Sequence, residues 1–222
     1  MALAGVIFDM DGVLCDSEPF ILAAAQTHLR RRYGIEVPAV DFQPWIGAGD
    51  DAFVGEPARQ HGVEAELPAD KEATYDCYDE LISGQLQALP GAIDFVTALQ
   101  RQGVPTAIAS SADRRKVRAN LQAIGLPETG FRAVVTGDDV QAKKPDPAAF
   151  RLAAAGMGCE LTACLVVEDA VNGVLAARAG GARCLAIRGS FSAQELTQAG
   201  AEAVIADLRD VPAGLRRECG LA

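Results

Sequence analysis

The chain has 222 residues, 50% of them hydrophobic and 23% charged, which is typical of a soluble globular protein able to bury a sizeable core. Its 30 acidic and 20 basic residues give a net charge of -10, and this disfavours nucleic acid and anionic membranes, which bind concentrated basic faces. No apolar run reaches the roughly 18 residues of a membrane span, and charged residues appear too early for a signal peptide, so we expect a cytoplasmic protein. We also expect a monomer.

The number and spacing of the cysteines and histidines indicate which metal sites and cross-links the chain could form. The six cysteines form no CxxC pair, and His28 and His61 are the only histidines. Zinc sites and disulfide frameworks need closely spaced cysteines or several imidazoles, so neither is expected here. We therefore predict that the cysteines are free thiols.

The first predicted element is a strand over residues 5–8, "GVIF", which is followed at once by a cluster of negative charge. Asp9, Asp11 and Asp16 come within eight residues of the end of this uncharged run. Carboxylates this close repel one another, so the pattern indicates a specific use for them.

The next segment is helical and acidic. Residues 20–34 follow a helical pattern, with Ser17 as a possible N-cap and Gly34 as the stop. No convincing strand occurs between residues 18 and 89, and this stretch holds 13 Asp and Glu against 5 Lys and Arg. We interpret residues 17–89 as a small α-helical cap domain inserted after the first strand.

After residue 90 short apolar runs alternate with amphipathic stretches, which is typical of βα units in a parallel sheet. With residues 5–8 they predict one α/β core with a Rossmann-like sheet, formed by residues 1–16 and 90–222. The predicted strands of this second part lie in residues 104–110, 133–136, 163–167, 183–187 and 203–206.

Polar side chains follow the predicted strands at the edge of the sheet where ligands usually bind. An all-oxygen set without histidine or cysteine suits a hard cation such as Mg²⁺. The residues at this edge are Asp9, Asp11, Ser110, Ser111, Asp138, Asp139, Lys143, Lys144, Glu168 and Asp169.

Four short motifs in this order, "DMDG", "ASS", "KKP" and "VVEDA", resemble those of the haloacid dehalogenase superfamily. The resemblance covers nearly the whole chain and is to the subgroup with a helical cap, which includes β-phosphoglucomutase and many sugar-phosphate phosphatases. The cap stretch "WIGAGDDAFVG" is similar to the corresponding domain of plant and algal suppressor-of-quenching proteins. A plastid location is therefore the alternative if the chain is part of such a protein.

The resemblance implies a Mg²⁺-dependent phosphatase that acts on a small phosphorylated metabolite through an aspartyl-phosphate. By resemblance Asp9 is the nucleophile and Asp11 the general acid and base. Ser110, Ser111 and Lys144 would bind the phosphate. The implied Mg²⁺ ligands are Asp9, Asp11 through its carbonyl, Asp169, and Glu168 either directly or through water.

The cap raises the question of phosphatase against mutase. In β-phosphoglucomutase an arginine after the cap glycine holds the second phosphate of a bisphosphate intermediate, and a histidine shortly after the first motif helps to position the general acid and base. This chain has Asp50 in place of the arginine and Ile21 in place of the histidine. Asp50 should repel a strongly anionic distal group, and the resemblance leaves Arg114 as the main candidate to contact that group. Ser17 and Gly47 are further candidate substrate residues. A phosphosugar mutase and a catalytically silent interaction domain stay open as alternatives.

Overall fold

The computed structural model describes residues 3–46 and 49–221, and the six predicted strands are confirmed in it as one sheet. The strands are β1 (Gly5–Phe8), β2 (Thr106–Ala109), β3 (Ala133–Val135), β4 (Cys164–Glu168), β5 (Arg183–Ile187) and β6 (Ala203–Ile205). The α-helices are α1 (Glu18–Tyr33), α2 (Asp50–Gln60), α3 (Ala69–Ile82), α4 (Ala92–Arg101), α5 (Arg114–Ala123), α6 (Ala148–Gly156), α7 (Val171–Ala179), α8 (Ala193–Ala199) and α9 (Ala213–Glu218). The 3-10 turns are η1 (Ala39–Trp45), η2 (Glu128–Gly130), η3 (Gly137–Asp139), η4 (Leu161–Ala163) and η5 (Leu208–Asp210).

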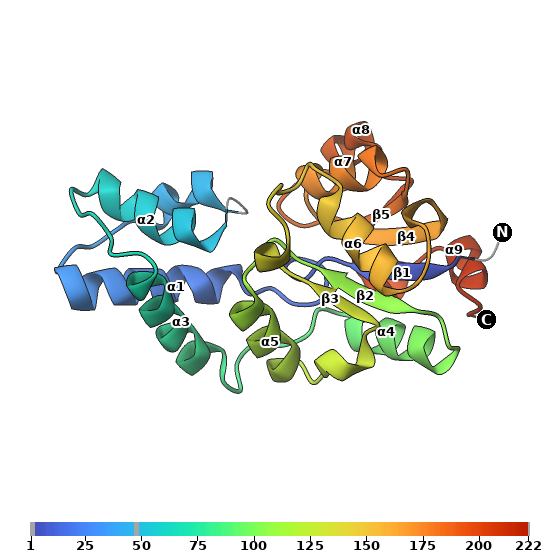
Figure 1. The fold of residues 1–222 in the computed structure, drawn as a ribbon, viewed down its shortest axis with the longest axis horizontal. Helices are drawn as coiled ribbons and strands as arrows, with labels where there is room; N and C mark the ends of the chain where they lie inside the picture. Colours follow the sequence, from blue (N-terminus) through green and yellow to red (C-terminus); the bar gives the residue numbers. More distant parts are fainter. Residues whose placement is uncertain (1–2, 47–48, 222) are drawn as a thin grey trace.

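All strands of the sheet are parallel, in the order β3-β2-β1-β4-β5-β6. Helices α6, α7 and α8 cover one face, and α4 and α5 lie on the other (Figure 1). Side chains of β1 alternate between two fully buried layers, since Phe8 packs with one apolar cluster and Ile7 with the other.

The strand order places the carboxyl end of β1 at the point where the chain switches from one side of the sheet to the other. Phe8 is in register with Ile108 of β2 and with Val167 of β4. The residue after Phe8 therefore comes next to the last residue of β4, and ligands bind at such switch points in open α/β sheets. The fold brings the predicted polar residues of three loops to one edge.

In the described part of residues 17–89 the regular elements are α1, η1, α2 and α3, joined by turns and loops, and α1, α2 and α3 lie together beyond one end of the sheet (Figure 1). The division into a core and a cap at these residues stays a prediction. Within the described ranges, no helix has both the length and the apolar character that crossing a bilayer requires.

The contact between α3 and α5 is largely polar. Arg115 of α5 donates to Glu72, Asp76 and Asp79 of α3, at 2.7 Å in each case. Tyr78 of the same helix donates its hydroxyl hydrogen to Asn120 Oδ1. One guanidinium group therefore forms hydrogen bonds with three carboxylates across this contact.

Helices α1 and α3 are joined by a buried carboxylate. Asp70 is fully buried, and its two oxygens accept from His28 Nε2 at 2.8 Å and from the Tyr33 hydroxyl at 2.6 Å. The Glu66 backbone N–H and the Arg32 guanidinium are its other partners. Burial alone would raise the pKa of Asp70, but these four donors outweigh it and hold the pKa below its usual value.

We expect Asp70→Asn to lower the free energy of unfolding by about 3 kcal/mol, because removing one partner of a buried ion pair leaves the other uncompensated. The native pKa of Asp70 is lowered, so its contribution is present above the unfolded-state pKa and is lost as pH falls through the native one. Urea denaturation at pH 7 and at a pH well below 3.8, the ordinary pKa of an aspartate, measures both effects. The exposed Glu80→Gln on the same helix is the control, and equal losses in the two variants would contradict the assignment.

Candidate active site

The ammonium group of Lys144 lies between two carboxylates at the carboxyl edge of the sheet. Its Nζ is 2.5 Å from Asp9 Oδ1 and 2.6 Å from Glu168 Oε1, and it also donates to the Ala109 carbonyl at 3.1 Å. Burial disfavours the charged lysine, but the two carboxylates outweigh it and raise the pKa of Lys144. Lys144 therefore stays positively charged beside Asp9.

The loop after β2 places a hydroxyl and backbone amides at the same edge. Ser110 is 2% exposed, and its Oγ accepts from the Ala112 backbone N–H at 3.1 Å, with the half-buried Ser111 between them. The loop after β3 is held separately, since Lys143 donates to the Gly137 carbonyl and Asp139 forms a capping box with Thr136. Glu168, and not Asp138 or Asp139, is thus the carboxylate that joins Asp9 in holding Lys144.

Asp11 has two partners, and neither follows from the local sequence pattern. Ser17 occupies the N-cap position of α1, but its hydroxyl donates to Asp11 Oδ1 and makes no capping bond to the helix. Lys116 of α5 places its Nζ 2.8 Å from Asp11 Oδ2. The carboxylates of Asp11 and Asp50 overcome the opposing effect of burial and raise the pKa of Lys116.

Two glycines make room for the acidic side chains. A Cβ on Gly173 would lie 1.9 Å from the Glu168 carboxyl carbon, and one on Gly12 would lie 2.0 Å from Asp169 Oδ2. Gly12 also has φ of 75°, a conformation that other residues rarely adopt. Both carboxylates are therefore packed directly against backbone.

The remaining carboxyl groups lack compensating positive charge. Burial raises the pKa of Asp9, and the Glu168 carboxylate adds to this while Lys144 only partly offsets it. Burial also raises the pKa of Asp169, with further contributions from Glu168 and Asp9. A divalent cation would relieve this excess of negative charge, and an oxygen-only donor set suits Mg²⁺. The residues present therefore fit such an ion.

The side chains alone do not complete a metal site. Among the residues that the structure describes, no group of three or more acidic, histidine or cysteine side chains is arranged to hold a metal ion. We expected Glu168 as a ligand either directly or through water, and both of its carboxylate oxygens have hydrogen-bond donors in the structure. Its Oε1 accepts from Lys144, and its Oε2 accepts from the backbone N–H groups of Asp169 and Ala170. A Mg²⁺ ion would thus depend on Asp9, Asp169 and the Asp11 carbonyl.

The structure places the candidate substrate residues Asp50 and Arg114 on different helices, α2 and α5. Asp50 Oδ2 accepts from the Tyr75 hydroxyl at 2.5 Å and from the Asp113 backbone N–H at 3.2 Å. The guanidinium of Arg114 contacts Glu128, Asp139 and the Val134 carbonyl and is not brought to Asp9. Gly47 lies outside the described residues. The structure therefore offers no contact between Arg114 and the site.

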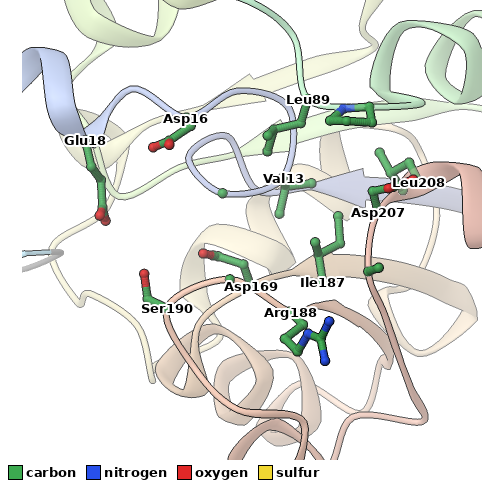
Figure 2. Close-up of a pocket in the computed structure, with 14 residues that line it drawn as sticks. Val13, Asp16, Glu18, Leu89, Asp169, Ile187, Arg188, Ser190, Asp207 and Leu208 are labelled. Atoms are coloured by element: carbon green, nitrogen blue, oxygen red, sulfur yellow. The ribbon is translucent and has the colours of Figure 1, made fainter.

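A cavity of about 320 Å³ flanks the site between the first loop and the ends of β5 and β6. Figure 2 shows Asp16 and Glu18 on one side of it, and Asp169 and Ser190 on the other. Neither Asp9 nor Lys144 lines this cavity, so it opens beside the Asp169 carboxylate and not over Asp9.

Sequence reasoning missed Lys116, Tyr78 and Asn120. All three are buried; Lys116 of α5 contacts Asp11, and Asn120 of α5 accepts from Tyr78 of α3. Lys116 and Asn120 are four residues apart and so share one face of α5. Two polar residues at this spacing beside the apolar Val117 and Leu121 were the signal available in the sequence.

Comparisons with known proteins agree with this geometry. Residues 3–181 match the family described as haloacid dehalogenase-like hydrolase. The solved structure of a hydrolase from Pseudomonas syringae superposes with a TM-score of 0.76 at 29% identity, covering 96% of this chain and 98% of that one.

Three curated relatives are similar over most of the chain. SUPPRESSOR OF QUENCHING 1, chloroplastic, from Arabidopsis thaliana is 38% identical over 94% of this chain, but the match spans only 20% of that protein's length. Hexitol phosphatase A of Escherichia coli is 31% identical, with 89% of each chain covered. Phosphoglycolate phosphatase 1 of Pseudomonas aeruginosa is 31% identical, covering 93% of this chain and 77% of its own.

We expect Gly173→Ala to displace the Glu168 carboxylate, because the new methyl group would occupy its position. Such overpacking should lower the free energy of unfolding by about 1–3 kcal/mol. Lys144 would lose one of its two carboxylates, and mass spectrometry should show that it reacts faster with acetic anhydride at neutral pH. Gly214→Ala in α9, where a Cβ meets nothing within 4 Å, is the matched control. Unchanged stability and reactivity in Gly173→Ala would contradict the packing described here.

Proposed function

The chain belongs to the haloacid dehalogenase-like hydrolase family, and we propose that it is a Mg²⁺-dependent phosphatase that hydrolyses a small phosphorylated metabolite through an aspartyl-phosphate. The observation that carries the proposal is the Asp9 carboxylate held at 2.5 Å from the Lys144 ammonium, with Asp11 two residues further along the chain. Two relatives of similar length are named as phosphatases, which supports the same conclusion.

In the proposed first step a carboxylate oxygen of Asp9 attacks phosphorus, and the bond from phosphorus to the ester oxygen breaks. Lys144 neutralises negative charge on both the nucleophile and the phosphate. Asp11 gives its proton to the departing alcohol oxygen. Ser110 and the neighbouring backbone N–H groups hold the phosphate oxygens.

In the second step a water molecule attacks the aspartyl-phosphate, and Asp11 takes the proton of that water. This releases inorganic phosphate and restores Asp9. Ser17 and Lys116 orient the Asp11 carboxylate through the contacts described above. When bound at Asp9, Asp169 and the Asp11 carbonyl, Mg²⁺ would neutralise charge on the transferring phosphoryl group.

The mutase is the rival reading, and the cap residues do not favour it. The position expected for a phosphate-binding arginine is occupied by Asp50, whose carboxylate accepts hydrogen bonds from the Tyr75 hydroxyl and the Asp113 backbone N–H.

We further propose that residues 17–89 form a cap over this site. We also propose that the protein is monomeric and cytoplasmic. The plastid is the alternative location, since the Arabidopsis relative is named as chloroplastic.

Asp9→Asn should lower phosphate release by about a thousandfold or more, because a carboxamide is a poor nucleophile and a missing nucleophile is rarely compensated. Release of phosphate from a panel of phosphate monoesters measures this, and the exposed Asp94→Asn on α4 is the control. Wild-type protein quenched in acid should carry a hydroxylamine-sensitive phosphoryl group that Asp9→Asn lacks. Formation of glucose 6-phosphate from glucose 1-phosphate and a bisphosphate primer, without free phosphate, would favour the mutase.

Removal of divalent cations with EDTA should abolish hydrolysis, and Mg²⁺ should restore it. Asp169→Asn should raise the Mg²⁺ concentration for half-maximal activity by about tenfold or more, since metal affinity depends strongly on the ligands and their support. Titration of activity with Mg²⁺ compares this variant with Asp16→Asn, an exposed acid of the same region. Activity that survives EDTA would argue against the proposed cation.

A further inference from the structure

A buried polar cluster lies on the side of Asp11 that faces α3 and α5. We call it the Lys116 cluster, and it consists of Asp11, Ser17, Tyr78, Lys116 and Asn120. Ser17, Tyr78 and Asn120 are fully buried, and Lys116 is 5% exposed. Lysine is rarely buried to this degree unless a specific anion is nearby, and here that anion is Asp11 at 2.8 Å.

The Lys116 cluster includes a buried hydrogen-bond donor without an acceptor among the described residues. A lysine ammonium has three N–H groups, and Lys116 donates to Asp11 Oδ2. Asn120 Oδ1 accepts from Tyr78, but its Nδ2 is buried without a partner among the described residues. Buried donors without acceptors are destabilising, so the cluster is suited to receive a further oxygen acceptor.

The position of the cluster relates it to the leaving group. In the proposed reaction Asp11 protonates the departing oxygen, so that oxygen must lie within hydrogen-bond reach of Asp11. Substituents one or two carbons away from it would then lie near the other neighbours of Asp11. Lys144 is not available to bind these substituents, because its ammonium group is paired with Asp9 and Glu168.

Two other cations near the contact between α3 and α5 are paired with carboxylates. Lys71 lies 2.7 Å from both Asp51 and Asp113, and Arg115 serves three carboxylates of α3. Asp50, which was expected to repel an anion, is hydrogen-bonded to Tyr75 and to the Asp113 backbone. Among the residues described, Lys116 is the cation that is paired with Asp11.

We propose that Lys116 is a specificity-determining residue that binds a carboxylate on the leaving group, with Asn120 Nδ2 as a second donor. The preferred substrates are then short phosphate monoesters with a carboxylate one or two carbons from the ester oxygen. A charged hydrogen bond between Lys116 and such a carboxylate would give strong discrimination. This inference rests on the phosphatase function proposed above and reverses the expectation of a leaving group without strong negative charge.

Matched substrate pairs test the proposal in the wild-type protein. 2-Phosphoglycolate is compared with 2-hydroxyethyl phosphate, and 3-phosphoglycerate with glycerol 3-phosphate, because each pair differs only in the carboxylate. We expect kcat/KM to be about tenfold or more higher for the carboxylate-bearing member, the usual effect of one charged hydrogen bond. Equal values, or a preference for the neutral member, would overturn the proposal and leave the phosphatase function intact.

Substitutions separate binding of the carboxylate from support of Asp11. Lys116→Met should lower kcat/KM for both members of a pair, because Asp11 loses a partner, and the loss should be about 10- to 100-fold larger for the carboxylate-bearing member, mostly through KM. Lys116→Arg should keep part of the preference, because the charge is retained. Arg118→Met, an exposed position of the same helix that pairs with Glu128, should change neither substrate.

The outcomes of these experiments are distinct. Equal losses for both members of a pair in Lys116→Met would show that the residue only supports Asp11, and would overturn the proposal. Absence of phosphate release from every ester in the wild type would overturn the phosphatase function as well. If Lys116→Met does not fold, product inhibition of the wild type decides instead, and glycolate should inhibit about tenfold more strongly than ethylene glycol. Equal inhibition by the two alcohols would contradict the assignment.

Discussion

The ammonium of Lys144 lies between Asp9 and Glu168, and the arrangement of the site depends on this one positive charge. Parallel strands β1 and β4 end side by side, so the fold itself brings two carboxylates together. Buried carboxylates without a counter-charge would repel and take up protons. Lys144 reaches them from the loop before α6, and Glu168 is fixed in turn by two backbone N–H groups. Asp9 is thereby held in place at the edge of the sheet, and Lys144 partly offsets the rise in its pKa that burial causes.

The elements that depend on local pattern could be predicted from the sequence. Short apolar runs separated by amphipathic stretches identify the six strands, because a sheet covered on both faces needs uncharged strands. Gly34 ends α1 with φ of 69°, as its place after the helical pattern predicted. The polar residues after β1, β2 and β4 also come together as expected, since parallel strands share one carboxyl edge.

Partners from distant segments could not be predicted in this way. The sequence predicts Ser17 as the N-cap of α1. In the structure the Ser17 hydroxyl instead donates to the carboxylate of Asp11, six residues earlier in the chain. The sequence predicts Glu168 as a metal ligand, directly or through water. In the structure its two carboxylate oxygens accept hydrogen bonds from Lys144 and from the backbone N–H groups of Asp169 and Ala170. Lys116 belongs to the site because α5 packs against α3, and no spacing in the sequence records that contact.

The acidic face of α3 has a consequence for how the two parts of the chain could be exchanged. Glu72, Asp76 and Asp79 follow one another at intervals of four and three residues, so they form a stripe along one side of the helix, and Arg115 meets all three. A helical segment transplanted from a relative would keep this contact with Arg115 only if it carried a similar stripe. Arg115 and this stripe are therefore a matched pair, and an exchange of α3 alone would leave Arg115 without its three carboxylates.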